Sequence, residues 1–185
     1  VDALGKVTDR LEITKTHTWT EADFATWKAL AERYGTGQTD LKTLRLIQGA
    51  GDNLDYLRVY VPKGSRITGL EGLELSALDT SEDLGYTVFA FPFGPVSAGQ
   101  SKTVALTYEL PFDLKTTPGD IYKFINQKQA GSEHITLSKS VAVSVRLKIV
   151  ETYPESAPGA FTLYPTFQTP LDSNQIFLSD IASAY

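Results

Sequence analysis

The sequence predicts an all-β fold with a helical insert, in the form of an antiparallel β-sandwich of Ig-like or Greek-key type. Three observations support this. Several segments alternate apolar and polar residues with period two, Gly and Pro punctuate the chain between them, and the length of 185 residues suits one sandwich. Half-buried strands of this kind favour antiparallel pairing, since parallel strands are apolar on both faces. We therefore expect a single domain over residues 1–185, with one helix near the N-terminus.

The first departure from the strand pattern is a predicted helix at approximately 21–34. Residues 11–19 begin as a strand, and Thr20 and Asp23 then form a capping box at the helix start. Gly35 is placed to end the helix. Apolar residues follow at helical spacing: Phe24, Trp27, Leu30, Ala31 and Tyr34. A helix of this length is marginal alone, so the apolar side either closes one open end of the sandwich or docks a partner through Phe24 and Trp27.

The remaining elements are strands and turns. Residues 40–47 fit a short helical turn or a strand, and residues 49–52 read as a turn. Strands are predicted at 56–61, 88–93, 103–110 and 141–150, with Gly94-Pro95 and Ala98-Gly99 breaking the chain between the second and third. One shared core is expected to contain Leu57, Val59, Val104, Leu106, Val143, Val145 and Leu147.

Composition excludes several classes of function. The absence of cysteine removes disulfides, thiolate zinc sites and a cysteine nucleophile. A net charge of −5 with scattered Lys and Arg argues against nucleic acid. The sequence has neither a signal peptide nor an apolar run long enough to span a membrane. Since the chain lacks Met even at its first position, we interpret it as a mature or excised segment, with any anchor outside it.

Catalytic patterns are equally sparse. The two histidines, His17 and His134, are far apart, and no HExxH, CxxC, GxSxG or P-loop pattern occurs. His17 shares the strand parity of Leu11 and Ile13, which favours a packed structural residue over a ligand. His134 is expected in a solvated turn. The sequence therefore predicts no enzyme and no cofactor.

Acidic residues offer a weak alternative of a metal site. Asp52, Asn53 and Asp55 lie close together beside Gly51, and their oxygen atoms are of the type that calcium prefers. The spacing is not that of an EF-hand, and turn chemistry explains Asp and Asn beside Gly equally well. Residues 79–83 are interpreted as a solvated acidic loop.

A row of aromatic residues suggests a different ligand. Tyr56 and Tyr60 share one strand face with Arg58, opposite the apolar row of Leu57 and Val59. Exposed tyrosines in a row can stack on sugar rings. The alternative is that the helix or a crossing loop covers this face, because an exposed row of this size would be adhesive.

Three blocks carry a family resemblance: YLRVYVPKGS, AGQSKTVALTYELPF and YKFINQKQAG. They are similar to the C-terminal β-sandwich region of a bacterial family known as domain of unknown function 4012. The chain departs from the family pattern at Asp55, at Ala98-Gly99, at residues 124–126 and at Ala130. The shared motifs are structural, so no functional residue is carried over. The resemblance implies a surface-exposed, membrane-anchored bacterial envelope protein.

Taken together, these features predict a non-catalytic extracytoplasmic module at the surface of a bacterium. Its expected role is structural or in protein interaction, with a protein partner or self-association. A carbohydrate-binding module acting through Tyr56, Tyr60 or Trp27 is the alternative. A hydrolase built from loop carboxylates would require two carboxylates facing each other across a cleft.

Overall fold

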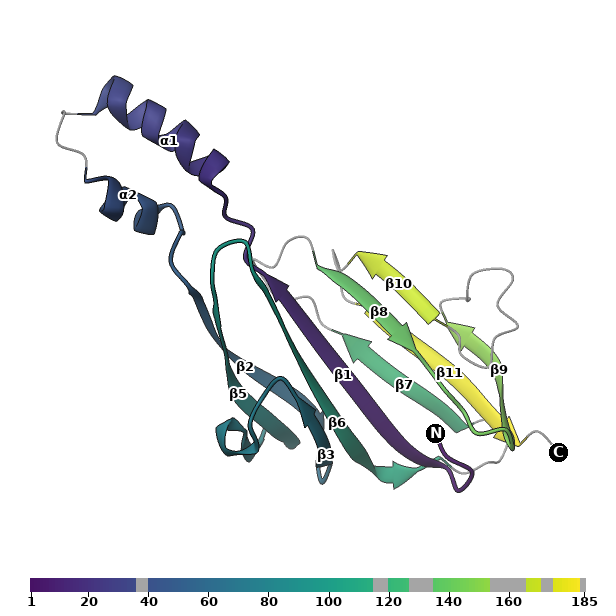
Figure 1. The fold of residues 1–185 in the computed structure, drawn as a ribbon. Coiled ribbons are helices and arrows are strands. Elements are labelled where there is room, and N and C mark those ends of the chain that lie inside the picture. The colour runs from purple at the N-terminus through teal and green to yellow at the C-terminus, as the bar shows by residue number, and fades with distance from the viewer. Residues whose placement is uncertain (36–39, 115–119, 127–134, 154–165, 171–174, 184–185) are drawn as a thin grey trace. The chain divides into compact units, whose positions relative to one another are not determined.

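The computed structural model describes residues 1–35, 40–114, 120–126, 135–153, 166–170 and 175–183. Strands predominate, and two helices interrupt them near the N-terminus (Figure 1). The strands are β1 Lys6–Thr16, β2 Asn53–Pro62, β3 Arg66–Glu71, β4 Asp79–Asp83, β5 Tyr86–Val96, β6 Ser101–Asp113, β7 Asp120–Asn126, β8 Thr136–Ser140, β9 Leu147–Tyr153, β10 Thr166–Pro170 and β11 Gln175–Ser183. The helices are α1 Glu21–Tyr34 and α2 Leu41–Ile47, with a short 3-10 turn at Leu75–Ala77.

The chain divides into two compact units. One unit comprises residues 9–111, and the other comprises residues 1–8 and 112–185. We call them the 9–111 unit and the C-terminal unit. The division falls inside β1 and inside β6, so both long strands contribute residues to each unit.

Two three-stranded sheets build the 9–111 unit, in the orders β2-β5-β4 and β1-β6-β3. β5 pairs antiparallel with β2 and with β4, and β3 pairs antiparallel with β6. Side chains from both sheets form one hydrophobic core whose buried members are Val61, Phe89, Phe91, Phe93, Val96, Val104, Leu106 and Tyr108. The predicted alternation of residues 56–61, 88–93 and 103–110 is confirmed, since Leu57 and Val59 also pack against this core.

The central strand β5 is longer than predicted. It continues through Gly94-Pro95 to Val96, and the chain turns only at Ala98-Gly99. Burial on both of its faces distinguishes β5 from its neighbours. Phe89 and Phe91 are 1% and 0% exposed on the core side, while Val88 is 0% exposed on the opposite side. Other side chains must therefore cover Val88 on the outer face of the β2-β5-β4 sheet.

The helix predicted at 21–34 is confirmed with its capping box. The backbone N–H of Asp23 donates to Thr20 Oγ1 at 3.2 Å, and the backbone N–H of Thr20 donates to Asp23 Oδ2 at 3.1 Å. The segment 40–47, for which the sequence allowed either a helical turn or a strand, contains the helix α2. Asp40 caps this helix, and its side chain accepts from the N–H of Lys42. We call α1 and α2 together the helical hairpin.

In the C-terminal unit, three strands form a sheet in the order β7-β11-β9, and β8 pairs with β10. The expectation that Val145 lies in the core is wrong, because its side chain is 79% exposed. Residues 141–144 form no strand; the N–H of Ser144 bonds to the carbonyl of Val1, and a turn follows before β9. Val143 and Leu147 are buried on either side of this turn, in the C-terminal unit and not with Leu57 and Val59.

Candidate functional site

Three strands bring tyrosines and aspartates together on the outer face of the β2-β5-β4 sheet. Residues directly opposite each other in a sheet share a face. The register pairs Tyr60 with Val88 and Val88 with Ser81, and it pairs Arg58 with Ala90 and Ala90 with Asp79. We call this surface the tyrosine face; it consists of Tyr56, Arg58, Tyr60, Asp79, Ser81, Asp83, Tyr86, Val88 and Ala90.

Hydrogen bonds fix the polar side chains of the tyrosine face across the central strand. The hydroxyl of Tyr56 on β2 donates to Asp79 Oδ2 on β4 at 3.0 Å. Asp83 Oδ2 accepts from the hydroxyl of Tyr60 at 3.1 Å and from the guanidinium of Arg58 at 2.8 Å. The face is therefore an ordered network that bridges β5, and it covers Val88 and Ala90, which are 0% and 6% exposed.

The aromatic rings of this network remain accessible. Tyr56, Tyr60 and Tyr86 are 58%, 42% and 49% exposed, so neither a helix nor a crossing loop covers them. The Tyr60 and Tyr86 rings meet edge to face with centroids 6.3 Å apart, and the Arg58 guanidinium lies 5.2 Å from the Tyr60 centroid. The sequence located Tyr56 and Tyr60, but missed Tyr86 and both aspartates, because cross-strand register is not readable from one strand.

These contacts shift the pKa values of Asp83, Tyr56 and Tyr60. The hydroxyl of Tyr60 and the guanidinium of Arg58 both donate to Asp83, and they hold the pKa of its carboxyl below the usual value. The hydrogen bond to Asp79 raises the pKa of Tyr56, and desolvation followed by the bond to Asp83 raises the pKa of Tyr60. At neutral pH both tyrosines are neutral donors and Asp83 is a charged acceptor.

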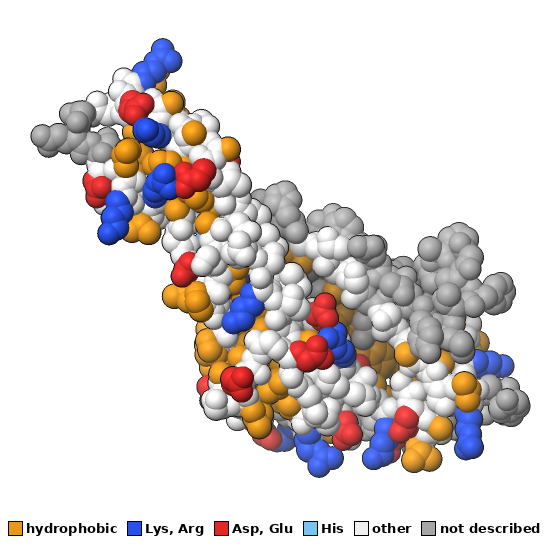
Figure 2. Space-filling view, in the orientation of Figure 1, with side chains coloured by type: hydrophobic (Ala, Val, Ile, Leu, Met, Phe, Trp, Pro, Cys, Tyr) orange, Lys and Arg blue, Asp and Glu red, His pale blue; other side chains and the backbone are white. Residues whose placement is uncertain are grey.

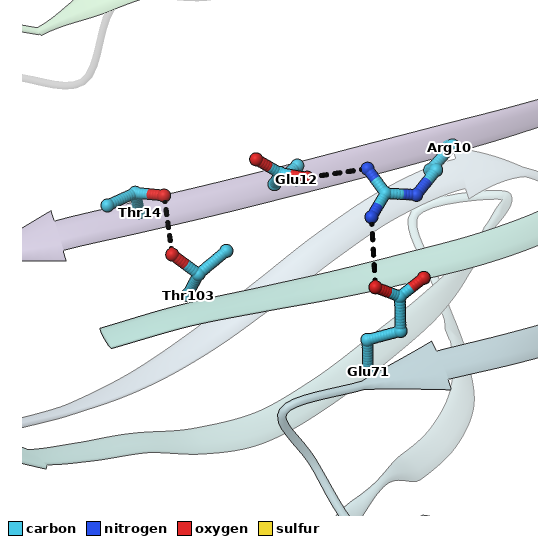
Figure 3. A network of polar contacts seen from close by, with 5 residues as sticks. All are labelled: Arg10, Glu12, Thr14, Glu71 and Thr103. Carbon is cyan, nitrogen blue, oxygen red and sulfur yellow. Dashed lines mark hydrogen bonds and ion pairs between the residues drawn. The ribbon is translucent and has the colours of Figure 1, made fainter. Parts of the chain in front are cut away.

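The outer face of the β1-β6-β3 sheet is different in kind. Arg10 donates to Glu12 at 2.6 Å and to Glu71 at 3.1 Å, and the hydroxyls of Thr14 and Thr103 are hydrogen-bonded at 2.8 Å (Figure 3). The Arg10–Glu12 pair lies within β1 and the other two contacts join different strands; exposed pairs of these kinds contribute modestly to sheet stability. Aromatic side chains are concentrated on one outer face of the unit and polar pairs on the other.

The helical hairpin is the second candidate surface. Phe24 is 4% exposed, and its ring lies 4.3 Å from the guanidinium of Arg45 on α2 and 6.3 Å from the ring of Trp19. Arg45 also forms an ion pair with Glu21. The contacts of Arg45 join the start of α1 to the last turn of α2, and the contact of Trp19 joins α1 to the segment before it.

Beyond its first turn, α1 keeps an uncovered apolar side. Trp27, which with Phe24 was expected either to close one end of the sandwich or to dock a partner, is 48% exposed in this chain. With seven residues, α2 is too short to pack along all fourteen residues of α1. The exposed large apolar residues of the hairpin are Trp27, Leu30, Tyr34, Leu41, Leu46 and Ile47, and Figure 2 shows hydrophobic side chains over both helices among charged ones.

His17 is a buried structural residue, as its strand parity predicted. Its side chain is 7% exposed, Nε2 lies 2.8 Å from the carbonyl oxygen of Gly51, and Nδ1 accepts from the N–H of Trp19 at 3.3 Å. Its own backbone bonds to Gln100 and Gly99. The other histidine, His134, lies outside the described residues.

The residues of the calcium alternative lie at the start of β2. Asp55 lies on β2 and forms an ion pair with Lys15, and Asn53 begins the same strand after Asp52. Over the part of the chain that the structure describes, no three His, Asp or Glu side chains gather where they could hold a metal ion. Within that same part, neither helix has the length and apolar character needed to cross a membrane.

Comparisons of this chain with protein-family models, with curated proteins and with solved structures found no match.

Proposed function

We propose that this chain is a non-catalytic module of a bacterial cell-surface protein, with a role in protein interaction. The resemblance of residues 56–131 to domain of unknown function 4012 supports the extracytoplasmic compartment and an anchor elsewhere in the protein. We also infer that the 9–111 unit is a β-sandwich of Ig-like or Greek-key type, since two three-stranded sheets share its core.

The observation that carries the proposal is the exposure of large apolar residues on both helices of the hairpin. Six large apolar residues are 40% to 72% exposed there, and short helices need such residues covered to be stable. Counted together with the cap residue Asp40, the hairpin carries four acidic residues, Glu21, Asp23, Glu32 and Asp40, and four basic residues, Lys28, Arg33, Lys42 and Arg45. A surface with no net charge suits a protein partner better than a polyanion or an anionic lipid surface.

The occupant that this surface fits first is a second copy of the chain. A symmetric pair of hairpins places the same apolar side chains on both partners, so each copy covers what the other exposes. Trp, Tyr and Arg, which are enriched in protein interfaces, are all present on α1.

Site-specific crosslinking on intact cells tests this function. A photoreactive amino acid is placed at Leu30 in the hairpin of the full-length protein, and at Leu84 as a control. Leu84 is 82% exposed in the same unit but lies between β4 and β5. We expect a discrete protein adduct, of twice the chain mass for self-association, from position 30 only. Equal crosslinking from both positions, or none, contradicts the proposal. Cleavage of a protease site inserted beside Leu84 on intact cells checks the surface location.

Carbohydrate binding is the second candidate, and the exposure of Tyr56 and Tyr60 favours it. These residues were expected to be buried if the face served only the fold, yet about half of each side chain is open to solvent. Trp27 is similarly exposed but stands on α1, away from the tyrosine face along the chain.

A further inference from the structure

We propose that the tyrosine face binds a linear, uncharged polysaccharide that lies along β2. The inference rests on the carbohydrate-binding candidate above and specifies its ligand class, its site and its direction. It is independent of the helical hairpin.

The rings of Tyr56 and Tyr60 are held in place before any ligand binds. Each is anchored through its backbone in β2 and through its hydroxyl on a carboxylate of β4. Little side-chain freedom remains to be lost when a ligand stacks on them, and binding costs less entropy for that reason. Between the two strands that carry these contacts, the face is filled by the buried side chains of Val88 and Ala90 on β5.

The face carries one net negative charge, because Arg58 is its single cation and Asp79 and Asp83 are both carboxylates. Arg58 is paired with Asp83, and Lys63 at the end of the sheet is paired with Glu82 at 2.8 Å. An anionic polymer would be repelled by this net charge, and a cationic one would compete with Arg58 for Asp83, whereas a neutral polymer does neither. The guanidinium of Arg58 has further N–H donors, and the carboxylates of Asp79 and Asp83 have further acceptor positions. Sugar hydroxyls both donate and accept, and they match this combination.

The arrangement of the rings selects a linear ligand. Tyr56 and Tyr60 are four residues apart on one strand, which at the usual rise separates them by about 13 Å. Tyr86 extends the aromatic surface at the Tyr60 end, where its ring meets that of Tyr60. A monosaccharide reaches one ring only, so affinity must increase with chain length until the ligand reaches from Tyr56 to Tyr86.

Isothermal titration with oligosaccharide series tests the proposal. The probes are cello-, laminari- and chito-oligosaccharides from the disaccharide to the hexasaccharide. At least one series is expected to bind with affinity that increases with length. Tyr56→Ala should weaken binding of the longest probe by about two- to tenfold, the usual contribution of an aromatic contact. Tyr56→Phe keeps the ring and should retain most of the affinity.

Two variants separate loss of the ring from loss of folding. Tyr60→Leu keeps an apolar cover over Val88 but removes the ring, and it should weaken binding as Tyr56→Ala does. Tyr34→Ala removes a tyrosine that is 72% exposed on α1 and should have no effect. Failure of all three series to bind overturns the proposal, as does binding that Tyr56→Ala and Tyr60→Leu leave unchanged. Binding of a proline-rich peptide in place of the sugars, with the same tyrosine dependence, also overturns it. None of these results bears on crosslinking from the hairpin.

Discussion

The imidazole of His17 is hydrogen-bonded to the carbonyl oxygen of Gly51 at 2.8 Å. A carbonyl only accepts, so Nε2 carries the proton, and Nδ1 is then free to accept from the N–H of Trp19. One neutral side chain thereby joins the segment that enters α1 to the segment that leaves α2. The helical hairpin is fixed to the 9–111 unit at this point.

Replacing His17 should loosen the base of the hairpin. His17→Ala leaves the carbonyl of Gly51 and the N–H of Trp19 without these partners; a fully buried group left unpaired costs about 1–3 kcal/mol, and these two partly buried groups should cost less. The only two tryptophans, Trp19 and Trp27, both lie in the 9–111 unit, so urea unfolding followed by tryptophan fluorescence reports on this unit. His17→Gln, whose amide can donate to Gly51, should recover part of the loss. Wild-type stability of His17→Ala would show that the contact is not structural.

Phe24 and Trp27 should respond differently to truncation. Phe24→Ala removes a side chain packed against Trp19 and Arg45, and it should cost about 3 kcal/mol or more, chiefly in the hairpin. Trp27→Ala should cost less in the monomer, because about half of that side chain is already in water. Hydrogen exchange of the α1 amides measures both effects. Equal loss of protection in the two variants would mean that Trp27 is packed as tightly as Phe24.

Neighbouring valines in the C-terminal unit give a matched pair. Val143→Asp buries an unpaired carboxylate at a position that is 8% exposed, and it should cost about 3 kcal/mol or more. Val145→Asp places the same group at a position that is 79% exposed, and it should change stability by no more than about 0.5 kcal/mol. Thermal melts followed by circular dichroism compare them. Unfolding by Val145→Asp would contradict the turn between Ser144 and Leu147.

The ionisation of Asp83 predicts a specific pH dependence. Its pKa is lower in the folded chain than in the unfolded chain, so its contribution to stability is present above about pH 4 and is lost as the pH falls through the folded pKa. Carboxyl chemical shifts measured by NMR should place the Asp83 midpoint below those of ordinary aspartates. Tyr60→Phe removes the largest cause and should raise the midpoint. An Asp83 midpoint unaffected by Tyr60→Phe would mean that the hydrogen bond is absent in solution.

Local signals in the sequence were sufficient for some elements and not for others. The bounds of α1 were predictable because Thr20, Asp23 and the apolar spacing act within a single helix. The row of Phe89, Phe91 and Phe93 was predictable because alternation on one strand reflects burial directly. Val145 was misplaced because the alternation of residues 141–150 continues across a turn that no Gly or Pro marks.

The candidate surfaces were only half predictable for the same reason. Tyr56 and Tyr60 could be assigned to one face of β2, but their partners Asp79 and Asp83 are more than twenty residues away and are set by strand register. The exposure of Trp27 depends on the shortness of α2, an element whose type the sequence left open. Both outcomes depend on pairing between segments, which a single strand or helix does not encode.

Deletion of the helical hairpin tests most directly the claim that the hairpin is an interaction surface on an independent β scaffold. Residues 20–49 are replaced by a short Gly-Ser linker, so that His17 and Gly51 and both sheets of the 9–111 unit remain. Native mass spectrometry and thermal melting are then compared with those of the intact chain. Our account predicts that the sheets still unfold cooperatively and that the hairpin-dependent dimer is lost. A dimer that persists without the hairpin, or sheets that no longer fold, would contradict the assignment of the hairpin as an interaction surface on an independent β scaffold.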